Sequence, residues 1–531
     1  MTEAVVPPPP PARPVTARFA ALVGAGILLS RIFGLVRQRA LAHYLGLSSP
    51  ADAFSAGFRI PNLLQNLFGE GVLSASFIPV YSRLLARGEG EEARRVAGAV
   101  FAFLSLVVAI VVLVGVLATP WLIDIIAPGF EGETRILAIR IVRVLFPGMG
   151  LLALSAWCLG ILNSHRRFFL PYVAPVVWNL AIIAALVAYG GRVADTELAV
   201  MAAWGSVAGS ALQLLVQLPV VLSFVPGMRP MLQTGPHVKT VVRNFVPAVL
   251  GRGVVQLGGY VDILIASLLP TGAVAALTNA QMLYTLPVSL FGMSVTAAEL
   301  PEMASDAAHE DVLGEKLGAR LHGGLRRIAY FIVPSAVAFL AFGDVIAAAL
   351  FETGEFSRED SIYVWGILAG SAVGLLASTM GRLYASAFYA LHDTRTPLRF
   401  AALRVILGMV TGALLALYVP SSLGIAARWG AAGITVASGL AGWVEYALLR
   451  SALRARLGIR PRMTRFILSL WAVAVVSAAV ALGVKLLMPV AHPWLMAGLV
   501  LGTFGVAYIA ITALVRIDEA RALIARVGRT R

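Results

Sequence analysis

LFGEGVLSASFIP, residues 67–79, recurs 223 positions later as LFGMSVTAAELP, residues 290–301, and the offset falls to 222 at the final prolines after a gap of one residue. In two further pairs of stretches, Phe130 matches Phe356 at an offset of 226 and His165 matches His392 at an offset of 227. These pairs are IIAPGFEGETR (125–135) with LFETGEFSRED (350–360), and LNSHRRFFLP (162–171) with ALHDTRTP (390–397). A nearly constant offset across three separated matches indicates an internal duplication.

The composition around these repeats is that of a membrane protein. Of the 531 residues, 59% are hydrophobic and 13% are charged, against about 25% charged in an ordinary soluble domain. The mean hydropathy is +0.85. Apolar runs long enough to cross a bilayer recur along the chain, whereas the short alternating strands of a membrane β-barrel do not. The sequence therefore predicts an all-α polytopic membrane protein.

Fourteen apolar segments can be drawn, and we expect each to be a transmembrane helix. They cover residues 19–45, 52–86, 93–127, 134–162, 169–190, 197–224, 239–269, 273–303, 318–350, 361–391, 397–419, 429–455, 465–488 and 493–516. The duplication makes the first six an N-lobe (19–224) and the next six a C-lobe (239–455), with the last two appended (465–516). Six spans per lobe keep both lobes in the same orientation, a parallel repeat typical of transporters.

The basic residues predict the orientation of the chain. Twenty-eight lysines and arginines fall on the side that holds both termini, four fall on the other side, and ten lie inside spans. This asymmetry follows the positive-inside rule, so both termini are expected in the cytoplasm. The net charge of +15 is thereby explained without a nucleic-acid partner.

The two ends of the chain are expected to lie outside the bundle. Residues 1–18, with five prolines at 7–11, are typical of a disordered cytoplasmic tail, and residues 517–531 of a basic cytoplasmic tail. A cleaved signal peptide is the alternative for the apolar stretch 19–30. The helical pattern, however, continues to His43 without a clear cleavage site.

Ten basic residues fall inside the predicted spans, where a charge is costly unless it faces a wet cavity or an anionic partner. They are Arg31, Arg37, Arg39, Arg59, Arg140, Arg143, Arg252, Arg382, Arg404 and Lys485. Arg39 and Arg404 lie near span ends, where snorkelling to the interface is expected. Arg37 points about 120° away from Arg31 around the first helix.

Arg31 and Arg252 are separated by 221 residues, so the repeat places them at equivalent positions of the two lobes. Two such cations predict a basic cavity on the pseudo-axis. The alternative is that the arginines pair with nearby acids, for which Asp52, Glu70 and Asp262 are available. The single cysteine, Cys158, excludes an internal disulfide, and no histidine pair has the spacing of a metal site.

Several stretches now resemble one known family. They are SRIFGLVRQ (30–38), ADAFSAGFRIPNLLQNLFGEGVLSASFIPVYS (51–82), APGF (127–130) and QLGGYVDILIASLLPTGAV (256–274). They are similar to the MurJ (MviN) lipid II flippases of the MOP exporter superfamily, over nearly the whole chain. The resemblance implies a cationic cavity lined by spans 1, 2, 7 and 8. It implies transport, by alternating access in the plasma membrane, of the undecaprenyl-pyrophosphate-linked peptidoglycan precursor to the outer leaflet. The cell-wall synthesis machinery is a candidate partner, and no cofactor is expected.

The resemblance also implies the residues of the site. Positions matching the family's first two helices are Arg31, Arg37, Asp52, Arg59, Asn62 and Glu70. Arg252 adds a cation that the family does not lead us to expect, and Gln281 stands where the family often has arginine. Gln38 and Gln65 likewise replace charges. Asp262 matches a monovalent-cation site whose other polar positions are glycines here, Gly408 and Gly412. Drive by the membrane potential alone is therefore an alternative to sodium coupling.

Three other functions remain as alternatives. The first is a flippase for another polyprenyl-linked saccharide, since the superfamily includes such proteins. The second is a scaffold, because several expected charges are amides. The third is a polytopic enzyme, which the short basic loops and the lack of a nucleophile–base motif disfavour. A drug exporter for organic cations would need an acidic cavity, contrary to the basic one expected here.

Overall fold

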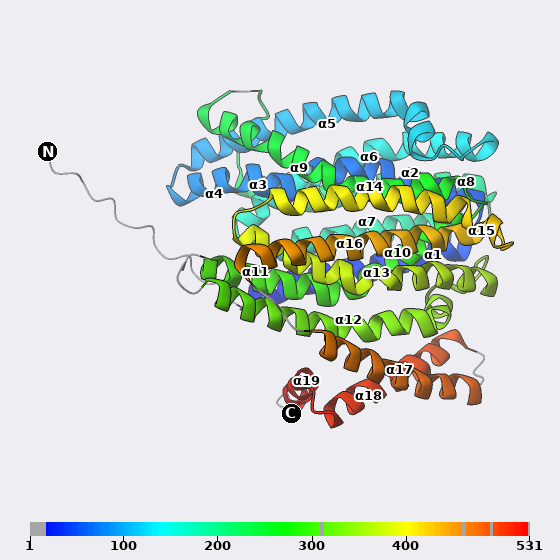
Figure 1. The fold of residues 1–531 in the computed structure, drawn as a ribbon. Coiled ribbons are helices and arrows are strands. Elements are labelled where there is room, and N and C mark those ends of the chain that lie inside the picture. Colours follow the sequence, from blue (N-terminus) through cyan, green and yellow to red (C-terminus); the bar gives the residue numbers. More distant parts are fainter. Residues whose placement is uncertain are drawn as a thin grey trace.

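The computed structural model describes residues 17–68, 70–232, 234–307, 313–458, 463–488 and 492–528. Long helices with roughly aligned axes make up almost all of these residues (Figure 1). Within the described ranges, the only β pairing is an isolated bridge between Thr353 and Phe356. The all-α fold class predicted from the sequence is confirmed.

Eleven of the described helical segments are long and apolar enough to cross a membrane. They are α5 (Gly90–Ile126), α6 (Gly132–Ser164), α7 (Phe169–Tyr189), α8 (Asp195–Phe224), the run Ala273–Asp306, α12 (Leu313–Phe351), α13 (Arg358–Ala390), α14 (Arg395–Leu417, continuing to Ser422), α16 (Gly430–Leu457), α17 (Thr464–Leu487) and α18 (Pro493–Leu514). Each corresponds to one predicted span.

The other three predicted spans contain charged residues within the helix. They correspond to α1 (Ala17–Leu45), α9 (Pro236–Ser267) and the segment beginning with α2 (Ser49–Phe68). Arginines such as Arg37 and Arg59 interrupt their apolar runs. That these three segments also cross the membrane, giving fourteen spans, stays a prediction.

The predicted spans that hold the two copies of the opening repeat both depart from the regular α-helix that the sequence analysis drew, the first by a turn and the second by a π-helical turn. Predicted span 52–86 is covered by α2, α3 (Glu70–Ser76) and α4 (Ile78–Ala86). A turn at Phe77 separates α3 from α4, which has a proline in its first turn. Predicted span 273–303 divides into α10 (Ala273–Pro287), the π-helical turn η1 (Val288–Met293) and α11 (Ser294–Ala307). Proline lacks the N–H that a regular α-helix needs, which favours the turn before α4 and the π-helical turn that follows Pro287.

The helices pack mostly within their own half of the sequence. In the first half α6 contacts α2 and α8, and α7 contacts α1 and α8; in the second half α13 contacts α12 and α16, and α16 contacts α14. The terminal pair α17 and α18 packs on α12 at one edge of the bundle (Figure 1). Helix α9 is different, because it contacts α3 and α5 of the first half as well as α14 of the second.

The segment predicted as a basic tail begins with a further helix, α19 (Asp518–Gly528). Arg326 of α12 donates from Nε and Nη2 to the two Glu519 carboxylate oxygens at 2.6 and 2.9 Å. The same guanidinium lies 4.4 Å from the ring centre of Phe466. This bidentate pair holds α19 against the bundle.

Candidate functional site

One end of the bundle is closed by two contacts that the repeat relates to each other. Glu355 donates its backbone N–H to the His43 carbonyl at 2.9 Å, and Gly129 donates its N–H to Ser267 Oγ at 3.2 Å. Gly129 and Glu355 differ by 226 positions, and His43 and Ser267 by 224. Each half therefore places the loop before a long helix against the end of α1 or α9 in the other half. We call this the closed end.

Close backbone approach at the closed end explains two of its glycines. A Cβ on Gly129 would lie 2.0 Å from the Ser267 carbonyl oxygen, and one on Gly354 would lie 2.2 Å from the His43 carbonyl oxygen. Gly354 also has φ +57, a conformation that disfavours side chains. His43 Nδ1 lies 2.9 Å from Thr353 Oγ1. No larger residue fits either contact without separating the halves.

Asp52 joins the two halves just inside the closed end. Its side chain is 4% exposed, and its two carboxylate oxygens accept the N–H groups of Gly272 at 2.6 Å and Ala275 at 2.8 Å. These donors belong to the first turn of α10, where unpaired N–H groups and the helix dipole favour a negative charge. Asp52 of α2 thus caps a helix of the other half. It does not pair with an arginine, as one alternative had supposed.

Two further polar contacts of α1 cross between the halves, and the sequence analysis missed both. Gln38, which is buried, donates from Nε2 to Asn279 Oδ1 of α10 at 2.7 Å. Arg39 donates to the carbonyls of Ala349 and Leu350 at 2.9 and 2.7 Å, at the end of α12. Arg39 therefore binds the carbonyl end of a helix, a specific contact in place of the snorkelling predicted for it.

Deeper in the bundle, Arg59, Gln281 and Asp262 form one hydrogen-bonded chain across the halves, and all three were predicted site residues. Arg59 Nη2 donates to Gln281 Oε1, and Arg59 Nη1 to the Gly259 carbonyl at 3.2 Å. Gln281 Nε2 donates to Asp262 Oδ2 at 3.2 Å. An amide can donate and accept at once. Gln281 therefore bridges Arg59 and Asp262 by hydrogen bonds. A cation from α2 and an anion from α9 thus belong to one polar site.

Asp262 has one more neighbour, Ser438 of α16, whose Oγ donates to Asp262 Oδ1 at 3.4 Å. Among the described residues no three His, Cys, Asp or Glu side chains are grouped as for a metal ion. On α14, a Cβ at Gly412 would meet only apolar carbons, those of Ile265 and Ala437. The structure thus brings the oxygen-bearing side chains of Asp262 and Ser438 together. Gly412 contributes no side-chain oxygen that could bind a cation.

Arg31 and Arg37 lie in different surroundings, as the helical spacing predicts. Arg31 is exposed and makes no hydrogen bond or ion pair with any residue that the structure describes. Arg37 is half-buried, with its Cζ 5.1 Å from the ring centre of Phe58 and 5.2 Å from that of Trp178. Arg37 is therefore held between α2 and α7 by cation–π contacts.

Three predicted positions are less informative. The side chains of Arg252 and Glu70 lie outside the described residues, so the predicted approach of Arg252 to Arg31 stays a prediction. Asn62 is half-buried on α2, three residues beyond Arg59.

Two other arginines inside spans have acidic partners on neighbouring helices. Arg404 of α14 pairs with Glu445 of α16 at 3.0 Å, and not by snorkelling alone as predicted. Arg140 of α6 pairs with Glu197 of α8 at 2.5 Å. The pairing proposed as an alternative for Arg31 and Arg252 is not observed for Arg31 among the described residues.

A duplicated bundle of apolar helices, closed at one end by symmetric loops and crossed inside by polar contacts between its halves, is the architecture of a membrane transporter. The family model for "Lipid II flippase MurJ" matches residues 41–508. The chain belongs to this family, whose members are transporters, not enzymes.

Relatives and solved structures agree with this assignment. The chain is 32% identical to the lipid II flippase MurJ of Burkholderia cenocepacia, over 85% of this chain and 86% of that protein. It is also 32% identical to a probable lipid II flippase MurJ of Rhizobium meliloti, over 87% and 86%. A structure described as lipid II flippase MurJ in an inward closed conformation has a TM-score of 0.77 at 22% identity, covering 95% of this chain and all of that one. An inward-facing multidrug-resistance MATE transporter of the MOP superfamily has a TM-score of 0.65 at 17% identity, over 82% and 98%. These two likenesses show the shared fold.

Proposed function

We propose that this protein moves lipid II, the undecaprenyl-pyrophosphate-linked peptidoglycan precursor, from the cytoplasmic to the outer leaflet by alternating access. Membership of the MurJ family supports the substrate. The observation that carries the mechanism is the closed end, where Glu355 meets His43 and Gly129 meets Ser267. Two related contacts that close one end can open together when the halves rock against each other.

In the proposed orientation both termini are cytoplasmic and the closed end faces outward. The charge asymmetry of the sequence supports this orientation. Substrate then enters from the cytoplasmic side while the closed end excludes it from the exterior. Coupling to the cell-wall synthesis machinery outside the membrane would consume the flipped product.

Arg31 is the residue we assign to the pyrophosphate. It is exposed and has no partner among the described residues, so its guanidinium is available for a bidentate phosphate contact. Arg59, which is tied to Gln281 and to the Gly259 carbonyl, adds positive potential to the same pathway. Arg37 adds to this positive potential from its place between Phe58 and Trp178. Arg252 is assigned to the same pathway by the repeat alone.

We propose that the membrane potential drives transport without a sodium requirement. The chain Arg59–Gln281–Asp262 already brings a guanidinium toward the carboxylate at which a sodium ion would bind. Gly408 and Gly412 supply no side-chain oxygen. Flipping into proteoliposomes with a potassium-diffusion potential should persist when sodium is replaced by choline. Loss of flipping in choline would support an Asp262 cation site.

The function itself is tested by complementation. The chain should restore growth to a cell whose own lipid II flippase is shut off, and lipid II measured directly in the outer leaflet should return. If another polyprenyl-linked saccharide appears outside instead, the alternative flippase function is correct. If growth returns while neither lipid reaches the outer leaflet, the chain acts as a scaffold.

A further inference from the structure

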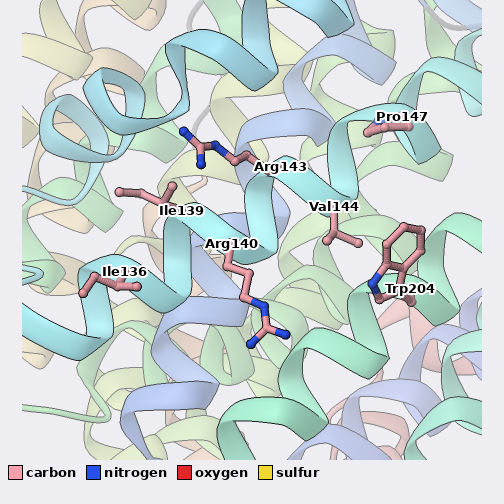
Figure 2. Close-up of a pocket in the computed structure, with 7 residues that line it drawn as sticks. All are labelled: Ile136, Ile139, Arg140, Arg143, Val144, Pro147 and Trp204. Atoms are coloured by element: carbon pink, nitrogen blue, oxygen red, sulfur yellow. The ribbon is translucent and has the colours of Figure 1, made fainter.

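A groove runs along the outer surface of α6, away from the contacts between the halves. Its volume is about 400 Å³. Six of its lining residues lie on α6 at alternating spacings of three, one and three residues, which is one continuous face of a helix. They are Ile136, Ile139, Arg140, Arg143, Val144 and Pro147. Trp204 of α8 forms the side wall beyond Pro147 and Val144 (Figure 2).

The apolar part of this groove is exposed on the outer surface of the bundle. Ile136 is 66% exposed and Trp204 is 53% exposed. On a helix that crosses a bilayer, such a face is covered by lipid chains. A tryptophan beside a channel of aliphatic carbons offers a flat wall to one acyl chain.

The charged part carries one net positive charge. Arg140 is paired with Glu197, which its Nη1 and Nη2 approach at 2.5 and 3.1 Å. Arg143 is exposed and makes no hydrogen bond or ion pair with any residue in the described ranges. In Figure 2 the two guanidinium groups point to different sides of α6, so Arg143 does not share the Glu197 carboxylate. An unpaired arginine beside apolar walls is complementary to one anionic group.

The depth of the arginines fits the phosphate level of a bilayer. Helix α6 has 33 residues, or about 50 Å, against a hydrocarbon core of about 30 Å, so each end extends about 10 Å beyond the core. Arg140 and Arg143 begin about 12 and 16 Å from the first residue. Side chains tilt toward the N-terminus of their helix and arginine snorkels, so both heads reach the edge of the core.

We propose that this groove binds an anionic phospholipid of the leaflet at the closed end, with the headgroup phosphate on Arg143 and one acyl chain along Val144, Pro147 and Trp204. Arg140, whose guanidinium points away from Arg143 and is paired with Glu197, is not part of this phosphate site. The occupant bridges α6 and α8, two helices of the first half. The lipid therefore stabilises that half as a unit while the halves move.

The proposal is tested by lipid binding, which does not require transport. Purified, delipidated full-length protein is titrated with dioleoyl-phosphatidylglycerol carrying brominated acyl chains, which quench nearby tryptophans. The quenching attributable to Trp204 is obtained by subtracting the Trp204→Phe variant. We expect saturable quenching with phosphatidylglycerol, and an affinity about tenfold lower in Arg143→Gln, because a hydrogen bond to a charged group contributes about 1.5 kcal/mol. The matched control is Arg192→Gln, which removes another exposed arginine at the same end of the bundle.

Three results would overturn the proposal. The first is equal affinity for brominated phosphatidylcholine, which would mean that Arg143 only snorkels among bulk lipids. The second is an equal effect of Arg143→Gln and Arg192→Gln, which would reduce the site to general surface charge. The third is competition by undecaprenyl phosphate at concentrations at least tenfold below those of phosphatidylglycerol, which would make the groove a site for the substrate's carrier lipid. Because each result is a binding measurement, it is distinct from failure of the proposed flippase function.

Discussion

Glu355 donates its backbone N–H to the carbonyl of His43 at 2.9 Å, which joins the loop after α12 to the end of α1 across the two halves of the bundle. The repeat produces the same junction a second time, between Gly129 and Ser267. Neither contact uses a charged group, and both depend on how closely two backbones approach. A closure built in this way is stable in one geometry and is lost as a unit when the halves separate.

Replacing Gly129 should therefore open the closed end. The new methyl group of Gly129→Ala would lie 2.0 Å from the Ser267 carbonyl oxygen, a distance that no rotamer change relieves. We expect a cysteine placed at Glu131, in a chain carrying Cys158→Ala, to react several-fold faster with an impermeant thiol reagent. Gly483→Ala is the matched control, because nothing lies within 4 Å of its added Cβ. Unchanged labelling in Gly129→Ala would show that the junction does not hold the end closed.

Asp52→Ala should weaken the same closure by a different route. It removes both acceptors for the Gly272 and Ala275 N–H groups, and loss of a helix cap costs about 0.5–2 kcal/mol. Asp360→Ala is the control, since Asp360 caps its own helix through Ser357 within one half. Both variants should melt at lower temperature, but only Asp52→Ala should increase labelling at the closed end. Equal labelling in the two variants would mean that Asp52 serves stability alone.

The contact of His165 with its neighbours should make the protein sensitive to mild acid. The His165 ring stacks on Phe224 with centres 4.3 Å apart, and its Nε2 lies 3.1 Å from the Tyr81 hydroxyl. Burial lowers the pKa of His165 below its ordinary value near 6.5. The folded state then prefers the neutral ring, so this contribution to stability is complete above pH 6.5 and is lost as the pH falls through 6.5 toward the lowered folded pKa.

We expect the melting temperature to fall between pH 7.5 and pH 5.5, and the fall to be smaller in His165→Phe, which keeps the stack and cannot ionise. His392 is the related position in the second repeat and is exposed. His392→Phe should therefore keep the full pH dependence. An identical pH dependence in wild type and His165→Phe would contradict a role for this ring.

The proposed orientation can be tested with two single cysteines in the Cys158→Ala background. Arg454→Cys lies at the end proposed to be cytoplasmic, and Glu131→Cys lies at the closed end. In intact cells only Glu131→Cys should react with an impermeant reagent, and Arg454→Cys should react after the cells are permeabilised. External labelling of Arg454→Cys would reverse the topology and, with it, the proposed direction of transport.

The sequence predicts the helical class and the duplication, because apolar runs and a constant offset are properties of the chain itself. Helical spacing also separates Arg31 from Arg37 correctly. The contacts of Arg39 and Asp52 could not be predicted in this way, since each binds backbone groups of a helix more than 200 residues away. No local pattern marks a backbone acceptor or donor. Arg404 was misjudged for a related reason, because its partner Glu445 lies on another helix and only the packing of α14 on α16 brings them together.

The most direct test of the proposed mechanism is flipping by Arg31 variants in cells whose own lipid II flippase is shut off, with lipid II measured in the outer leaflet. Arg382→Ala is the control, because Arg382 is likewise an exposed arginine inside a span. Arg31→Ala should be inserted and folded as wild type, yet should flip at least tenfold less, and Arg31→Lys should recover little because an ammonium cannot form the bidentate contact. Arg382→Ala should flip normally. A stable Arg31→Ala protein that delivers lipid II at the wild-type rate would contradict the assignment of Arg31 to the pyrophosphate.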